Sequence, residues 1–413
     1  MKRLIPMPLV ATALGLLLAA GFHTEAATWS VGASGCDFTN IASAVAFASV
    51  LDGDTIVISN AVHTEANITV NKSLTFRGQG MTSTILQAAT NRNITTSPIF
   101  FLQNASYKAV TFRDMTLRYA RNQNTMNGGA ISCFWTGLSY TTTVVNCYFT
   151  MNDGQSAYGG GAIGNDGECD LTVSNCFFEN NATSSGKSGG AIYSRKGNIR
   201  IYGSTFLANA GGDKGGAIYI ELGAYPNLAA RILNCTIVSN TAASQWAGGV
   251  HLSTVASSTA LVANCTIVGN SALFGGGVAM EGAGRPEIHS TILATNLASN
   301  SGHDLFIYNG PALLTNSLLM NPAVLWQGSA SLSAGSNVTN QNPKLYPLAN
   351  NGGSTLTMAL YADSPCIDKG SNPAGLARDQ RGGRYERVFG AAADIGALEY
   401  GAGAIRGTVV ITR

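Results

Sequence analysis

The hydrophobic and polar positions of this chain repeat one short phrase between about residues 127 and 296, with a period of about 25 to 33 residues. The first half of the phrase is a glycine pair followed by small and branched residues, as in Gly128-Gly129-Ala130-Ile131, Gly160-Gly161-Ala162-Ile163, Gly189-Gly190-Ala191-Ile192, Gly215-Gly216-Ala217-Ile218, Gly248-Gly249-Val250 and Gly276-Gly277-Val278. The second half lies roughly midway between these and reads Val145-Asn146-Cys147-Tyr148-Phe149, Ser174-Asn175-Cys176-Phe177-Phe178, Tyr202-Gly203-Ser204-Thr205-Phe206, Leu233-Asn234-Cys235-Thr236-Ile237 and Ala263-Asn264-Cys265-Thr266-Ile267. Such a period predicts a solenoid in which each repeat forms one coil.

The second half of the phrase predicts where each coil turns. Strict alternation along residues 173–178 would place Val173, Asn175 and Phe177 on one face and bury an amide. One asparagine in the left-handed conformation shifts the alternation by one residue, so that Cys176 and Phe178 face inward instead. Because coils stack about 4.8 Å apart, we expect an asparagine ladder at the corners and a cysteine ladder beside it, formed by Asn146, Asn175, Asn234 and Asn264 and by Cys147, Cys176, Cys235 and Cys265.

The predicted fold is all-β. It is a single-stranded right-handed parallel β-helix, a solenoid with a helical N-terminal cap and a turn-rich C-terminal cap. The glycine pairs fit a further corner, where the backbone needs a positive φ or a close approach to the next coil. The frame of leucine-rich repeats is absent, and the many Gly, Asn and Thr residues oppose helical repeats. The predicted boundaries are a signal peptide 1–26, an N-terminal cap 27–59, the β-helix 60–335, a C-terminal capping module 336–400 and a tail 401–413.

Both caps have a sequence basis. Apolar residues at Ile41, Val45, Phe47 and Val50 predict a short amphipathic helix over residues 41–51, laid across the first coil to cover its edge. From residue 340 the chain becomes turn-rich and partly charged, which predicts a module that wraps the final coil. We expect a structural ion-pair set to hold this module together, formed by Asp379, Arg381, Asp394 and Glu399.

The first residues predict export. Lys2 and Arg3 precede an apolar run over residues 9–20, and small residues lead up to Ala26, after which we expect cleavage of a secretory signal peptide. The run is too short for an ordinary membrane span, although a retained anchor is the alternative. No later stretch is long and apolar enough to cross a bilayer, so we expect an exported mature chain with no integral membrane span, located outside the cell or at the outer-membrane surface.

Composition agrees with an exported β-solenoid. Charged residues are 11% of the chain and glycine accounts for 49 of 413 residues, so Thr, Ser and Asn cover the outside in place of charge. Removing Lys2, Arg3 and Glu25 with the signal changes 24 basic and 22 acidic residues to 22 and 21, a formal net charge of +1. This balance argues against nucleic acid as a partner.

The cysteines allow two interpretations. Neighbours in the cysteine ladder lie within disulfide range, but side chains stacked in register point the same way and fit the required dihedral poorly. Buried thiols acting as small apolar residues are therefore favoured over ladder disulfides. Cys133 and Cys169 follow the glycine phrase in successive coils and are the better candidates for a disulfide, while Cys36 and Cys366 lie in opposite caps.

Candidate catalytic chemistry is sparse. Phrases of pectin-degrading glycosidases, such as Asn-Thr-Asp, Asp-Asp and Gly-His-Gly, do not occur. The nearest acidic cluster is Asp166, Glu168 and Asp170, a weak candidate for calcium, with Arg195 and Lys196 about one coil later. A solvated loop is the favoured interpretation of this cluster. Among the histidines, His289 is expected to replace asparagine at the corner of its coil, while His251 and His303 are expected to be structural surface residues.

Several of these phrases resemble known families. The Gly-Gly-Ala-Ile phrases, together with the pairs Phe149/Asn152, Phe178/Asn181 and Phe206/Asn209, resemble passenger repeats of the chlamydial polymorphic outer membrane proteins. Residues 340–400 resemble the C-terminal module of bacterial exported β-helix proteins of the choice-of-anchor Q type. Residues 35–78 are similar to the N-terminal cap and first coils of pectate-lyase-like β-helix proteins. The resemblance implies a secreted or surface-attached protein, often suspected of adhesion, with no common catalytic residues.

The expected function is binding or structural. We expect a non-catalytic, adhesin-like protein of the cell envelope that contacts surface glycans or other envelope or host components, with no catalytic residues and no cofactor apart from the weak calcium candidate. The alternative is a carbohydrate-active β-helix enzyme, such as a polysaccharide lyase, that acts on acidic polysaccharide. The two differ in whether carboxylates and a Lys or Arg converge in one groove.

Overall fold

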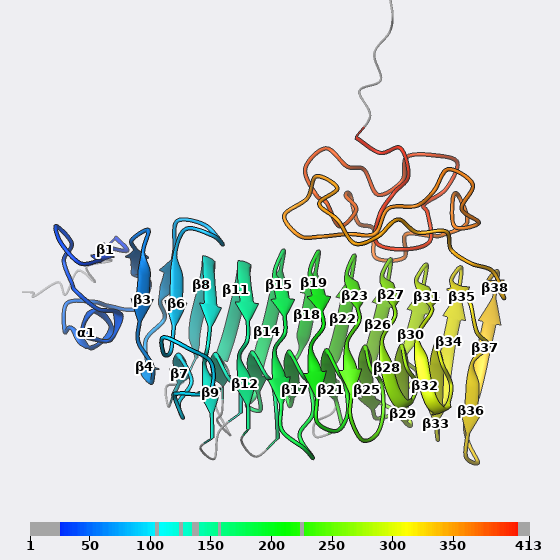
Figure 1. Ribbon diagram of the computed structural model, residues 1–413, viewed down its shortest axis with the longest axis horizontal. Helices are drawn as coiled ribbons and strands as arrows, with labels where there is room; N and C mark the ends of the chain where they lie inside the picture. The colour runs from blue at the N-terminus through cyan, green and yellow to red at the C-terminus, as the bar shows by residue number, and fades with distance from the viewer. Residues whose placement is uncertain are drawn as a thin grey trace, which may run out of the picture.

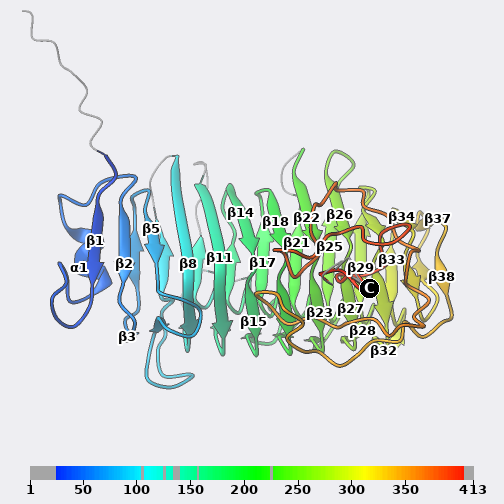
Figure 2. The same ribbon diagram turned by 90° about the horizontal axis from the view of Figure 1, so that it is seen from above.

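The computed structural model describes residues 25–103, 107–123, 127–133, 140–155, 158–223 and 227–403. In these residues the chain forms a rod of stacked coils, about nine turns long, with a C-terminal module against one side (Figure 1, Figure 2). Strands of successive coils pair in parallel along the whole rod. The predicted all-β parallel solenoid is therefore confirmed.

The rod is built from three sheets. The 21-stranded sheet comprises β1 (Thr28–Val31), β2 (Thr55–Ile58), β3 (Val62–Thr64), β5 (Thr75–Arg77), β6 (Ile85–Gln87), β8 (Lys108–Arg118), β11 (Tyr140–Thr150), β14 (Cys169–Ser174), β15 (Phe177–Glu179), β18 (Ile199–Tyr202), β19 (Thr205–Leu207), β22 (Ala229–Leu233), β23 (Thr236–Val238), β26 (Thr259–Ala263), β27 (Thr266–Val268), β30 (Glu287–His289), β31 (Ile292–Ala294), β34 (Pro311–Thr315), β35 (Leu318–Leu319), β37 (Ser331–Gly335) and β38 (Val338–Thr339). The ten-stranded sheet comprises β4 (Ile68–Val70), β7 (Phe100–Leu102), β10 (Ile131–Cys133), β13 (Ile163–Asn165), β17 (Ile192–Arg195), β21 (Ile218–Glu221), β25 (Val250–Thr254), β29 (Val278–Gly282), β33 (Leu305–Tyr308) and β36 (Val324–Trp326). The seven-stranded sheet comprises β9 (Arg121–Asn122), β12 (Asp153–Gly154), β16 (Ala182–Thr183), β20 (Ala210–Gly211), β24 (Thr241–Ala242), β28 (Ser271–Phe274) and β32 (Leu297–Ser301).

The corner asparagines have the predicted left-handed conformation. Asn146, Asn175, Asn234 and Asn264 have φ values of 51° to 53°, and the cysteine that follows each of them is fully buried. The equivalent corner in the coil after Asn264 is Ser290 rather than His289, because His289 pairs in register with Ala263. The corner assignment of His289 was therefore wrong by one residue.

A second row of asparagines lies wholly inside the rod. The amide nitrogen Nδ2 of Asn181 donates to Oδ1 of Asn209 at 3.0 Å and to the carbonyl oxygen of Phe149 at 3.0 Å. The backbone N–H of Asn181 also donates to Oδ1 of Asn209. The same pattern links the asparagines of the Phe-x-x-Asn phrase and their later equivalents, Asn152, Asn181, Asn209, Asn240, Asn270 and Asn296. This internal ladder satisfies buried backbone and side-chain groups along one edge of the core.

Apolar rows fill the rest of the interior. The rings of Phe149, Phe178 and Phe206 stack with centroid separations of 4.8 Å and 4.7 Å and are nearly parallel. The ladder cysteines Cys147, Cys176, Cys235 and Cys265 are free buried thiols, as favoured from the sequence. Each thiol takes the place of a small apolar side chain next to a ring or an aliphatic neighbour.

The glycine pairs meet both requirements expected of them. In the first four pairs the first glycine has a positive φ, for example 81° at Gly160 and 69° at Gly189. A Cβ on the second glycine would collide with backbone in the next coil, because the carbonyl oxygen of Gly190 lies against Gly161. At these corners glycine avoids backbone strain at the first position and a backbone clash at the second, whereas Ala247 takes the positive φ in a later coil.

The N-terminal helix is shorter than expected. Helix α1 spans Ile41–Ala46 and is the single α-helix of the described residues. Asn40 caps its start by accepting from the backbone N–H of Ser43 at 2.8 Å. The ammonium group of Lys72 donates to the carbonyl oxygens of Val45 and Phe47, and the chain leaves the helix there. The helical N-terminal cap predicted over residues 41–51 is therefore not shown, and one short helix lies beside β1, β2 and β4.

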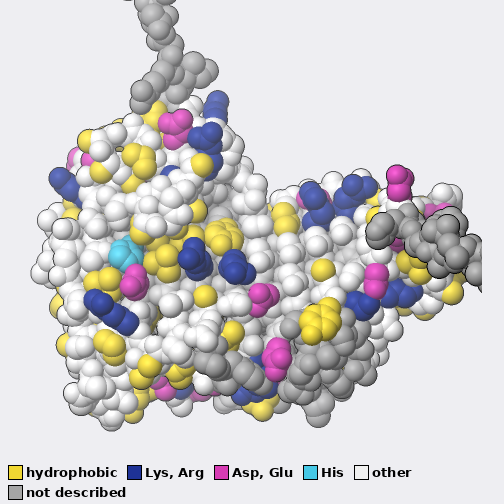
Figure 3. All heavy atoms as spheres, turned by 180° about the vertical axis from the view of Figure 1, so that it is seen from behind, with side chains coloured by type: hydrophobic (Ala, Val, Ile, Leu, Met, Phe, Trp, Pro, Cys, Tyr) yellow, Lys and Arg dark blue, Asp and Glu magenta, His cyan; other side chains and the backbone are white. Residues whose placement is uncertain are grey.

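The C-terminal module lies along the flank of the rod instead of wrapping its final coil (Figure 1). A row of threonine side chains on the short strands after the corner fixes it in place. Thr205 Oγ1 donates to the carbonyl oxygen of Leu356, and Thr236 Oγ1 hydrogen-bonds to Oε1 of Gln380, both at 2.6 Å. In the space-filling view the module stands above the rod as an overhang, and most of the visible surface is neither charged nor hydrophobic (Figure 3).

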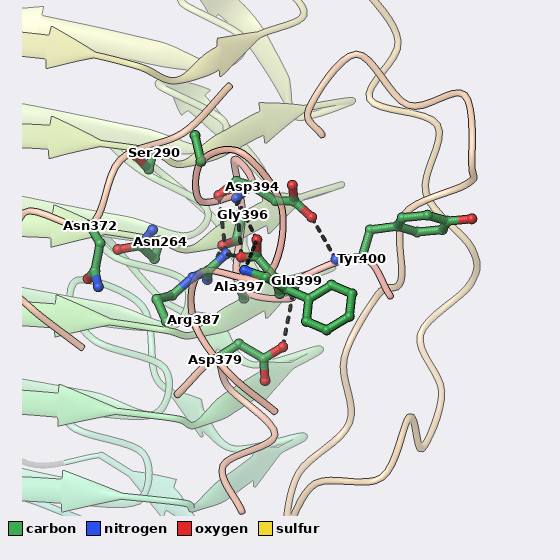
Figure 4. A network of polar contacts seen from close by, with 12 residues as sticks. Asn264, Ser290, Asn372, Asp379, Arg387, Asp394, Gly396, Ala397, Glu399 and Tyr400 are labelled. Carbon is green, nitrogen blue, oxygen red and sulfur yellow. Dashed lines mark hydrogen bonds and ion pairs between the residues drawn. The ribbon is translucent and has the colours of Figure 1, made fainter. Parts of the chain in front are cut away.

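A buried ionic network holds the module together and to the rod (Figure 4). Arg387, which is fully buried, pairs with Glu399 at 2.5 Å and donates to the carbonyl oxygen of Gly396 at 2.9 Å. Arg381 pairs with Asp379 at 2.6 Å, so the predicted ion-pair set is present in part. Burial raises the pKa of Glu399 to about 7 although Arg387 opposes this shift. Arg387, the central cation of the network, was not predicted from the sequence.

No helix of the described residues is long and apolar enough to cross a membrane. The predicted signal peptide falls almost entirely on residues 1–24, which lie outside the described residues. Its cleavage therefore stays a prediction.

The internal ladder provides a test of what stabilises the rod. Asn209→Ala removes partners from buried groups in both neighbouring coils, and each group left unsatisfied costs about 1–3 kcal/mol. We expect the free energy of unfolding in urea to fall by about 3 kcal/mol or more. Asn175→Gly is the matched control, because Asn175 is exposed and glycine already occupies the same corner in the next coil as Gly203. Equal losses in both variants would contradict the assignment.

Candidate functional site on the outer face of the ten-stranded sheet

The outer face of the ten-stranded sheet carries two rows of chemically distinctive side chains. Alternation along β17 turns Ile192 and Ser194 inward and turns Tyr193 and Arg195 outward. Parallel register then repeats each outward position in the following coils. The first row is Tyr193, Tyr219, His251, Ala279, Phe306 and Val324, and the second row is Arg195, Glu221, Ser253, Glu281, Tyr308 and Trp326.

Aromatic rings run almost without interruption along this face. Tyr193 stacks on Tyr219 with centroids 5.2 Å apart, and Tyr219 stacks on His251 at 5.1 Å, with the two rings of each pair nearly parallel. Trp246 continues the contacts, at 5.6 Å from His251 and 4.7 Å from Tyr308. We call this set the aromatic strip, and it consists of Tyr158, Tyr193, Tyr219, Trp246, His251, Phe274, Phe306, Tyr308 and Trp326.

Residues just before the glycine corners cover the strip. The ammonium group of Lys214 lies 4.4 Å from the ring centroid of Trp246, and the guanidinium of Arg195 lies 4.3 Å from that of Tyr158. These are cation–π contacts that orient the rings. Tyr158 is 41% exposed and Trp326 is 45% exposed, whereas Trp246 is half-buried. Parts of several rings are therefore accessible along the length of the strip.

A small ionic cluster lies beside the middle of the strip. The carboxylate of Glu281 is 3.4 Å from Nζ of Lys214 and 3.3 Å from Nε2 of His251. Burial lowers the pKa of His251, and Glu281 only partly offsets this, so the imidazole is neutral at neutral pH. Burial disfavours the charged form of Glu281, but His251 and Lys214 outweigh it and leave the pKa of Glu281 lowered.

His251 is fully buried and poorly partnered. Neither ring nitrogen makes a hydrogen bond with any described residue, since the contact with Glu281 lacks hydrogen-bond geometry. The ring is covered by Tyr219 and Trp246. A neutral imidazole next to a carboxylate and an ammonium group can exchange protons, but in this arrangement it does not reach solvent. The prediction that His251 is a surface residue is therefore wrong.

The predicted calcium cluster is a structural ion pair. The guanidinium of Arg195 donates to both carboxylate oxygens of the buried Asp166, from Nε at 2.6 Å and from Nη2 at 3.0 Å. Asp170 accepts from the backbone and side-chain N–H groups of Asn198. No group of three or more His, Cys, Asp or Glu side chains within the described ranges could hold a metal. Asp166, Glu168 and Asp170 therefore do not converge as metal ligands. The favoured interpretation of a solvated loop is also wrong, because Asp166 is buried.

The proposed disulfide between Cys133 and Cys169 is not formed. The two cysteines belong to different sheets, in β10 and β14, and both are free thiols. The hydroxyl of Thr142 lies near both thiols, 3.6 Å from the sulfur of Cys133 and 3.3 Å from that of Cys169. Both cysteines follow a glycine phrase in the sequence, but they do not occupy equivalent positions of successive coils.

The sequence contained a signal for the aromatic strip that the analysis did not use. Tyr193, Tyr219 and His251 each follow directly the branched residue that ends a glycine phrase, and Lys214 and Trp246 stand just before such a phrase. In a solenoid, positions at a fixed offset from a repeated phrase must stack. This constant offset predicts that Tyr193, Tyr219 and His251 form one row. The contacts that Lys214 and Trp246 make with the strip depend on the geometry of the corners.

Comparisons with known proteins give one family match and several structural neighbours. A family model described as a right handed beta helix region matches residues 141–296. Among solved structures, pectate lyase Pel9A is 14% identical, with 90% of this chain and 96% of that chain covered and a TM-score of 0.46. The A-module of the Azotobacter vinelandii mannuronan C-5 epimerase AlgE4 is 10% identical, with coverages of 70% and 89% and a TM-score of 0.33. The alginate lyase AlyF-OU02 is 13% identical, with coverages of 91% and 96% and a TM-score of 0.32.

No curated protein matches the chain in sequence. The coil geometry and the family match together show a right-handed parallel β-helix. Since fold alone does not determine function, the function has to be argued from the side chains of the strip.

The pair of Arg195 and Asp166 can be tested directly. Arg195→Ala leaves the buried carboxylate with only Lys196, 3.7 Å away, so we expect the free energy of unfolding to fall by about 3 kcal/mol. Arg200→Ala is the control, because Arg200 is exposed and should change stability by less than about 0.5 kcal/mol. Calcium or a chelator should leave the melting temperature of the native protein unchanged. A calcium-dependent rise of several degrees would contradict the structural role of Asp166.

Proposed function

We propose that the protein binds a carbohydrate polymer along the aromatic strip. The observation that carries the proposal is the continuous run of rings parallel to the rod axis, several of them partly exposed. Sugar rings present C–H faces that pack flat on aromatic rings, while their hydroxyl groups need polar partners at the rim. An aromatic side chain buries a large area at low cost in conformational entropy, which suits repeated weak contacts.

Polar groups stand beside the rings at intervals of one coil. Glu221, Glu281, Lys214 and Arg195 lie at the rim of the strip, with side chains that are partly accessible. Coils stack about 4.8 Å apart, so a polymer that follows the axis would meet a ring and a polar group at each step. The repeated geometry supports recognition of an extended chain over recognition of a single small molecule.

We propose an extracellular setting for this binding. The basic residues and apolar run at the start of the sequence predict export, and the resemblance to exported β-helix proteins supports the same location. The natural ligand would then be a glycan of a cell envelope or of a host surface. An adhesin-like role and a role in holding an envelope polymer both follow from the same strip.

Binding can be measured by affinity electrophoresis and calorimetry with a panel of neutral and acidic polysaccharides. For a polymer that binds, we expect Tyr158→Ala together with Trp246→Ala to weaken binding about tenfold or more, which corresponds to about 1.4 kcal/mol. Tyr107→Ala is the matched control, because Tyr107 is 82% exposed and lies outside the strip. Melting curves would show that the double variant is folded. An unchanged affinity for the polymer in a folded double variant would contradict the proposal.

Catalysis on an acidic polysaccharide is the second candidate. It is favoured by the neutral imidazole of His251 beside Glu281 and Lys214, a set able to accept and donate protons. In an elimination, a base would remove the proton next to a sugar carboxylate, the glycosidic C–O bond would break, and the leaving oxygen would take up a proton. Because His251 is covered by Trp246, this chemistry requires the tryptophan to move, and for this reason binding is the better supported function.

A rise in ultraviolet absorbance from new double bonds would detect elimination. If the cluster is catalytic, Glu281→Gln should lower the rate at least about a hundredfold while leaving polymer binding within a few-fold. Glu287→Gln is the control, since Glu287 is 42% exposed and pairs with His289 on another sheet. Polymer binding without any product would support the binding function alone.

A further inference from the structure

The C-terminal end of the rod exposes its hydrophobic core. One interior row of the ten-stranded sheet consists of Leu252, Met280, Ile307 and Leu325 in successive coils. The first three side chains are 1% exposed, whereas Leu325 in the last coil is 47% exposed. In the neighbouring sheet, Ala334 of the last coil is also exposed, and it follows the buried Leu314 in register. The core is therefore cut open at this end.

The strands of the last coil are also open along one edge. Among the described residues, β36 pairs with β33, β37 with β34 and β38 with β35, and none of the three has a strand on its other side. The ribbon views agree, because β37 and β38 end the rod and the C-terminal module turns back over the flank (Figure 1, Figure 2). An open edge presents unpaired N–H and C=O groups that can recruit another strand.

This edge lacks the devices that usually protect one. Exposed edge strands normally carry charged side chains, especially lysine, or are interrupted by bulges. Residues 305–343 contain no Lys, Arg, Asp or Glu, although they form the last coils and the start of the module. Because this end of the rod carries no charge, a charged partner would gain no ion pairs by binding to it. The same end of a second copy of the chain is equally apolar and uncharged, and it can therefore pack against this end without burying an unpaired charge.

The N-terminal end of the rod is protected differently. In β1, the backbone N–H of Ser30 donates to the carboxylate of Asp37 at 2.7 Å, and its carbonyl oxygen accepts from the N–H of Phe38 at 3.0 Å. The N–H of Gly32 donates to the carbonyl oxygen of Phe38 at 2.9 Å. The outer edge of the first strand is thus already paired within the chain, which disfavours stacking one rod head-to-tail on another.

We propose that two copies of the chain associate through their C-terminal ends, with the edge of β37 pairing antiparallel to β37 of the second copy. A twofold axis at this point joins identical surfaces, so the contact closes and does not extend into a fibre. The two open cores, including both Leu325 side chains, would cover each other. Ser333, in the middle of β37, would lie opposite its own copy.

Sedimentation velocity of the full mature chain over a range of concentrations tests this dimer. The native protein should sediment with twice the mass of one chain at micromolar concentration. Ser333→Lys should halve that mass, because it places like charges opposite each other across the twofold axis. Leu325→Lys should have the same effect, and Ser333→Lys carries the test if Leu325→Lys does not fold. Val62→Lys is the matched control at the N-terminal end, where Val62 is 52% exposed, and it should remain dimeric.

The outcomes separate the possible occupants of the open end. A native monomer at all concentrations would overturn the proposal. Filaments, or a dimer that Val62→Lys also dissociates, would indicate head-to-tail contact and would equally overturn it. A dimer that both end variants dissociate and Val62→Lys does not would support it.

Discussion

The internal asparagine ladder is the interaction on which the rest of the structure depends. In each coil one amide accepts from the backbone and side chain of the preceding coil and donates to a carbonyl oxygen beside it, as Asn181 and Asn209 show. Because these groups are buried, a missing partner would cost more than an ordinary hydrogen bond contributes. The ladder therefore fixes the register between coils. Apolar rows such as Phe149, Phe178 and Phe206 can then stack ring on ring, because the backbone spacing and rotation are the same in every coil.

Fixed register also determines what the outside of the rod can do. Any outward residue that recurs at the same offset becomes a row, whether or not its members interact favourably. On the ten-stranded sheet this gives the stack of Tyr193, Tyr219 and His251, with Glu281 and Lys214 beside it. The burial that makes the stack rigid also removes His251 from solvent and keeps its ring neutral. A rigid, linear and partly exposed set of rings suits an extended ligand better than it suits proton transfer.

The C-terminal module shows how a regular rod acquires an irregular partner. Threonine hydroxyls on β19, β23 and β27 recur at one offset and present hydrogen-bonding groups along the flank. The module satisfies them and buries Arg387 and Glu399 in doing so. Since the module covers the flank, the end of the rod stays open. The flank of the rod is thus polar and covered by the module, whereas the C-terminal end of the rod is apolar and carries no charge.

The sequence by itself determined the repeat, the corner asparagines and the inward cysteines, because period and alternation act between residues that are close in the chain. It also indicated why both glycines of a pair are needed. Other features depend on contacts between distant residues. Only the tertiary structure showed that Arg195 neutralises Asp166, that Cys133 and Cys169 belong to different sheets, and that His289 lies one place before its corner. The module lies on the flank for the same reason: its position depends on hydroxyl and amide partners more than a hundred residues away in the chain, which no local pattern encodes.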